Sequence, residues 1–143
     1  MNSRINHLAV WILVVVHQVI GFGWYTIFNN IWLNLHAKTM TDIESPHDFA
    51  PFLIAIVTSI VVNYTLAWLI VRLNAASGVA GVKIALICWF SFLFCEHATI
   101  SAFAAFGTNP WPLVFLDMGR PFLAFAVSGL VLGAWRRSAP TPA

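Results

Sequence analysis

Four long, uninterrupted apolar stretches restrict what this chain can fold into. They cover residues 8–28, 51–73, 82–103 and 113–135. Each reaches the roughly 20 residues that a helix needs to cross a bilayer. Membrane-spanning strands are only about ten residues long and alternate in polarity, so these stretches indicate helices. We predict an all-α integral membrane protein, a four-helix bundle that forms a single domain over residues 1–143, with a long outer loop at residues 29–50.

The composition excludes a soluble domain. Hydrophobic residues make up 60% of the chain and charged residues 8%, whereas soluble domains contain about 45–50% apolar and about 25% charged residues. Seven basic and five acidic residues are also too few and too scattered for a nucleic-acid-binding surface. The expected partner is therefore the lipid bilayer, and nucleic acid is excluded.

The basic residues predict the orientation of the chain in the membrane. Most of them fall on the side that holds both termini: Arg4, Arg72, Lys83, Arg136 and Arg137. The opposite side has only Lys38, with Arg120 just inside the fourth span. Because basic residues accumulate on the cytoplasmic side, we expect both termini in the cytoplasm. The first stretch has no small-x-small cleavage site after it, so we expect it to be retained as a span. We predict a multi-pass protein of the cell inner (cytoplasmic) membrane.

Two short stretches carry a family resemblance. One is Gly21-Phe22-Gly23-Trp24-Tyr25 with Phe28 and Trp32, and the other is Leu116-Asp117-Met118-Gly119 followed by Gly129-Leu130-Val131-Leu132-Gly133-Ala134-Trp135. In order and spacing the chain resembles the domain-of-unknown-function 1761 family of small bacterial membrane proteins. The resemblance implies a four-helix membrane protein and no agreed activity, and it adds no catalytic residue. Cys95-Glu96-His97 and Arg120-Pro121 depart from the expected family pattern.

Ionisable residues within the spans are candidate site residues, because a charge is costly in hydrocarbon. Glu96 and Arg120 each lie roughly 10 Å below the outer surface, at 1.5 Å per helical residue. A short loop joins their spans, so we predict a Glu96–Arg120 ion pair. Asp117 lies one turn from Arg120 and is expected to share it. Such a cluster is consistent with a structural lock between helices and equally with a ligand or proton site.

His17, near the middle of the first span, and His97, beside Glu96, extend this cluster. Two facing histidines suggest haem as a cofactor, although their depths differ by roughly 7 Å; hydrogen bonding to neighbours is the simpler expectation. Asn63 is expected to hold helices together by hydrogen bonds. The outer loop contains five residues of types that bind metals: His36, Asp42, Glu44, His47 and Asp48. Their spacing matches no known site, so no metal is predicted.

Small residues predict where helices pack. Gly129 and Gly133 form a GxxxG motif, which favours close approach of another helix within the chain or in a dimer. A second stripe of small residues in the third span also favours close packing: Cys88, Ser91, Cys95 and Ala98.

These features favour a membrane protein that binds a small apolar or anionic ligand, or acts as a homo-oligomer or partner subunit. Its predicted cluster comprises Glu96, His97, Asp117, Arg120 and His17. One alternative is a small membrane enzyme that uses Glu96 or His97 as acid or base, although no nucleophile or metal motif supports it. The other is an ion or proton pathway, which four spans can form only within an oligomer.

Overall fold

Four helices of the protein are long and apolar enough to cross a membrane, which confirms the predicted all-α architecture. The computed structural model describes residues 3–41, 49–104, 109–135 and 137–138. Within these ranges the elements are β1 (Ser3–Arg4), α1 (His7–Leu35), α3 (Ala50–Arg72), α4 (Gly78–Cys88), η1 (Trp89–Phe94), α5 (Cys95–Ala104), α6 (Trp111–Ala134) and β2 (Arg137–Ser138). Helix α4, the π-helical turn η1 and helix α5 follow one another without a break and form the third span.

Local sequence signals account for the helix starts. The Asn6 side chain accepts a hydrogen bond from the backbone N–H of Ala9 at the start of α1, and Ser77 does the same for Ala80 in α4. Proline occupies the first turn of α3 and of α6, where a backbone N–H has no helical partner.

Helix α1 is longer than the apolar stretch that predicted it. It continues to Leu35, so residues 29–35, predicted to lie in the outer loop, form the last two turns of the helix. Residues 42–48, which contain the acidic part of that loop, lie outside the described residues.

Backbone-to-backbone packing joins α4 to α6. A Cβ atom built on Gly81 would overlap the carbonyl oxygen of Gly129, and one on Gly129 would lie 2.5 Å from the carbonyl oxygen of Gly81. A Cβ atom on Gly133 would lie 2.5 Å from the carbonyl oxygen of Ser77. The GxxxG motif therefore makes an intrachain contact, which only glycine permits.

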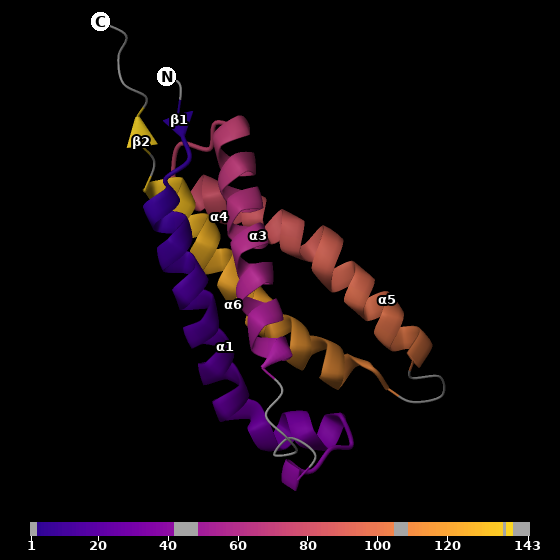
Figure 1. Cartoon of the computed structure of the whole chain (residues 1–143). Coiled ribbons are helices and arrows are strands. Elements are labelled where there is room, and N and C mark those ends of the chain that lie inside the picture. The colour runs from indigo at the N-terminus through magenta and orange to yellow at the C-terminus, as the bar shows by residue number, and fades with distance from the viewer. Residues whose placement is uncertain (1–2, 42–48, 105–108, 136, 139–143) are drawn as a thin grey trace, which may run out of the picture.

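Helix α5 leaves the bundle. Figure 1 shows α5 diverging from α1 and α3, beyond the crossing of α4 and α6. In an 18-residue stretch of the third span 11% is buried inside the protein, against 28% in each of the first two spans and 33% in the fourth. The small-residue stripe predicted to pack closely does not do so in this chain, since Ser91 and Cys95 are exposed.

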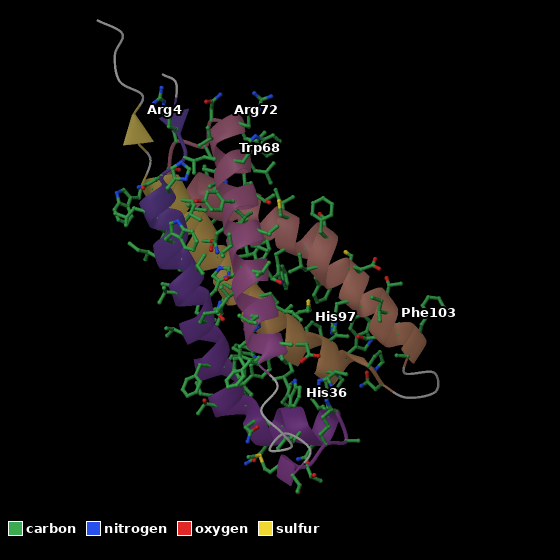
Figure 2. All side chains as sticks on the ribbon, viewed as in Figure 1. Arg4, His36, Trp68, Arg72, His97 and Phe103 are labelled. Atoms are coloured by element: carbon green, nitrogen blue, oxygen red, sulfur yellow. The ribbon has the colours of Figure 1, made fainter. Side chains whose placement is uncertain are left out.

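The two ends of the described chain meet. β1 pairs with β2 in antiparallel register, with Arg4 opposite Arg137, and the Asn6 side-chain N–H donates to the carbonyl oxygen of Trp135 at 3.2 Å. Both termini consequently lie at one end of the bundle (Figure 1). Arg4 and Arg72 are found at this end, opposite His36 (Figure 2).

Candidate functional site

A buried polar network joins α1, α3 and α6 in the middle of the bundle. His17 Nε2 lies 2.8 Å from Ser128 Oγ, and Ser128 Oγ donates to Asn63 Oδ1 at 2.7 Å. His17 is 6% exposed, and Asn63 and Ser128 are fully buried. His17 Nε2 also lies 3.4 Å from Asn63 Nδ2, so this nitrogen contacts both other members of the network, and the tautomer of the ring sets whether it donates or accepts.

The network extends along α3 to Ser59 and from there to Gln18 on α1. Asn63 Nδ2 donates to the carbonyl oxygen of Ser59 at 2.8 Å, and Gln18 Nε2 donates to Ser59 Oγ at 3.1 Å. His17 and Asn63 were predicted from the sequence, whereas Ser128 and Gln18 were not. The available signal was their position as polar residues within apolar spans, where such side chains hydrogen-bond across helices.

A cavity of about 270 Å³ lies beside this network. Its polar lining consists of His17, Gln18, Thr58, Ser59 and Arg120, and its apolar lining includes Ile54, Leu93 and Phe125. The lining residues come from α1, α3, η1 and α6. The cavity therefore combines a cation with hydrogen-bonding groups inside a membrane-spanning segment.

Arg120 faces α1 and the cavity, and the predicted ion pair with Glu96 is not formed. Arg120 Nη1 lies 3.7 Å from the position that a Cβ atom of Gly21 would take. The ion pairs of the described residues involve Asp117 and two histidines, and neither includes Arg120. Glu96 is exposed on α5. Glu96 lies on the exposed face of α5 while Arg120 faces α1, so equal depth does not bring the two side chains together.

Asp117 binds histidines from two other elements. Its Oδ2 lies 3.4 Å from Nε2 of His36, at the end of α1, and 3.7 Å from Nε2 of His97 on α5. Figure 2 shows both histidines at the end of the molecule away from Arg72. Among the described residues, no group of three His, Cys, Asp or Glu side chains is suited to hold a metal ion. Asp117 thus lies against histidines from α5 and the end of α1, contacts that are ionic where those rings are protonated, and it forms no ion pair with Arg120 among the described residues.

The structure divides the predicted cluster into separate parts. His17 and Arg120 line one cavity, His97 and Asp117 form the outer ionic contact, and Glu96 is exposed. His17 is bonded to Ser128 while His97 faces Asp117, so the two histidines do not face each other as axial haem ligands would.

The two family-like stretches contact each other next to the cavity. Trp24 Nε1 donates to the carbonyl oxygen of Leu116 at 3.1 Å, and the Trp24 ring lies where a Cβ atom of Gly119 would be. On the adjacent turn of α1, a Cβ atom on Gly21 would lie 3.7 Å from Arg120 Nη1, in ordinary van der Waals contact. Gly119 and Trp24 hold α1 against the part of α6 that carries Arg120.

Comparison with known proteins gives a family match over most of the chain. The sequence model of one family, described as "Protein of unknown function (DUF1761)", matches residues 8–133. No curated protein and no solved structure matches the chain. The matched residues include all four spans and both stretches that converge beside Arg120.

Proposed function

Because the chain belongs to the DUF1761 family, whose description names no activity, we propose its function from its site: it is a multi-pass membrane protein that binds a small anionic ligand in the cavity between α1, α3 and α6. The observation that carries the proposal is Arg120, a cation without an acidic partner among the described residues, which lines the cavity. A guanidinium in a membrane span is costly unless an anion neutralises it. Its planar fork suits a carboxylate or a phosphate group.

The remaining lining supports the same ligand class. Gln18 and Ser59 supply further hydrogen-bonding groups at the cavity wall, while Ile54, Leu93 and Phe125 supply apolar contact. Small-molecule sites commonly combine such an apolar wall with a few polar groups that fix orientation. The fully buried Ser128 is better suited to hold the three helices together than to react with a substrate.

The ligand proposal is tested by identifying what purifies with the protein. We expect wild-type protein to carry a bound anionic molecule detectable by native mass spectrometry, and Arg120→Gln to lose it. Loss of a hydrogen-bonded charge costs about 1.5–3 kcal/mol, or roughly tenfold or more in affinity. Lys83→Gln is the matched control, because Lys83 is exposed on α4 and does not line the cavity. Equal ligand retention by both variants would refute the proposal.

A second candidate function, as a partner subunit or homo-oligomer, rests on the third span. This span is the least buried of the four, and Glu96 is exposed on it. A carboxylate in a span faces protein or water rather than lipid, so a neighbouring chain that carries a basic group would satisfy it. The enzyme and ion-pathway alternatives have less support, since Glu96 and His97 lie apart from the cavity lining.

We also place the protein in the cell inner membrane with both ends in the cytoplasm. Support comes from the basic residues at the end of the bundle where the termini meet, including Arg4 and Arg72 (Figure 2). A green fluorescent reporter fused to the C-terminus should fluoresce, and alkaline phosphatase fused there should be inactive. An active phosphatase fusion would show that the C-terminus faces away from the cytoplasm and would contradict the proposed orientation.

A further inference from the structure

We propose, building on the ligand function above, that the ligand is an amphiphile whose anionic head binds beside Arg120 and whose single long hydrocarbon chain lies in an apolar groove between α3 and the third span. This assigns the ligand to a chemical class: a long-chain carboxylate or phosphate taken from the bilayer.

The groove is a second cavity of about 200 Å³. Helix α3 contributes Val61, Val62, Thr65, Leu66 and Leu69, and the other side is formed by Cys88, Phe92, Leu93 and Phe125. Its lining contains no charged residue. A polar group placed there would lose its hydrogen bonds to water without replacement, whereas a hydrocarbon chain has no hydrogen bonds to lose and makes dispersion contacts with the lining.

The groove adjoins the polar cavity. Val62, Leu93 and Phe125 line both of them, so these three side chains form the boundary that a ligand occupying both would cross. Along α3 the combined lining extends from Pro51 to Leu69. At 1.5 Å per residue this is about 27 Å of helix axis, close to the roughly 30 Å thickness of the hydrocarbon core. One long chain with its head group fits this length better than a compact molecule does.

The distribution of charge fixes the direction of the ligand. Arg120 and His17 line the cavity and are absent from the groove lining. An anionic head beside Arg120 neutralises the guanidinium and leaves the chain to the apolar side chains. The reverse orientation would place hydrocarbon on Arg120 and a charge among Leu66, Leu69 and Phe92, which is unfavourable at both ends.

The two native cysteines of the chain allow ligand binding in the groove to be tested without introducing a new cysteine. Cys88 lines the groove, whereas Cys95 is exposed and lines neither cavity. In phosphatidylcholine nanodiscs, hexadecanoate or hexadecyl phosphate should slow the reaction of Cys88 with N-ethylmaleimide and leave Cys95 unchanged. At ten times the Kd the rate should fall about tenfold, because only free protein reacts. Hexadecanol and butyrate should protect much less, because one lacks the charge and the other the chain.

Two variants distinguish the contribution of the anionic head group to binding from that of the hydrocarbon chain. Arg120→Gln should abolish protection by both anionic amphiphiles. Thr65→Trp should fill the groove and weaken hexadecanoate about tenfold or more while leaving stabilisation by butyrate intact; Thr99→Trp on the exposed face of α5 is the matched control.

The outcomes distinguish this inference from the proposed function. Protection of Cys88 by only one of the two head groups would support the inference and identify the head as carboxylate or phosphate. Stabilisation by hexadecanoate that depends on Arg120 but leaves Cys88 unprotected would retain the proposed function and overturn the groove. Absence of any Arg120-dependent binding would overturn both.

Discussion

Helices α4 and α5 belong to one apolar span but differ in what they contact. Helix α4 lies against α6 through Gly81 and buries Gly81 and Ala85. Helix α5 buries only Ser101, and its Ile100 is 58% exposed. Lipid tails are as apolar as these side chains, so hydrophobicity does not drive helices together in a bilayer. The comparison teaches that small residues, which let backbones approach, decide where two spans stay together.

The largest expected effect comes from replacing the glycine at the α4–α6 crossing. Gly129→Leu would insert a side chain where the Gly81 carbonyl oxygen and the Ala85 Cβ atom already lie within 2.8 Å of the Cβ position. We expect a loss of about 3 kcal/mol or more, at the upper end of overpacking costs, measured by thermal unfolding in detergent. Gly23→Leu is the control, because nothing lies within 4 Å of its Cβ position. Similar midpoints for both variants would break the comparison.

A smaller effect is expected from the network that holds α1, α3 and α6. Ser128→Ala removes the hydroxyl between His17 and Asn63 and leaves buried polar groups without a partner. We expect a loss of about 1–2 kcal/mol. Thr99→Ala on α5 should have little effect, because Thr99 is exposed and bonds only to a carbonyl oxygen of its own helix. If denaturant unfolding gives equal losses, the network does not stabilise the packed half preferentially.

The smallest effect on the isolated chain is expected at Glu96. Glu96→Leu on α5 removes an exposed charge that has no ion-pair partner among the described residues. The free energy of unfolding, obtained from thermal unfolding, should therefore change by no more than about 0.5 kcal/mol. If α5 serves as a partner-binding helix, the same substitution should lower the oligomeric mass measured by light scattering. A large destabilisation of the monomer would show that α5 is held within the chain after all.

Much of the fold could be predicted from the sequence. In lipid the backbone N–H and C=O groups must hydrogen-bond within the protein, so an apolar stretch of about 20 residues forms a helix. The close contact at Gly129 and Gly133 was also predictable. The partner of a given side chain was not. A short loop was expected to bring Glu96 and Arg120 together, and His97 of α5 does contact Asp117 of α6. Depth does not fix which way a side chain faces, however, and Glu96 is exposed while Arg120 faces α1.

The partners of Asp117 show a second limit. Asn29 and Asn30 interrupt the apolar stretch and predicted the end of the first span, but α1 continues to Leu35 and carries His36 to Asp117. Helix continuation beyond the hydrocarbon depends on tertiary contacts, which composition does not encode. Likewise Ser128 becomes important only because the bundle places it between His17 and Asn63.

The pairing of β1 with β2 makes the chain nearly circular in topology. Arg4 lies opposite Arg137, so a short linker between these two strands would close the described chain into a ring. New ends could then be opened in a loop between two spans. The same proximity affects assays of association. Complementary halves of a split reporter fused to the two ends of one chain would reassemble within that chain, so self-association must be measured with the halves on separate copies.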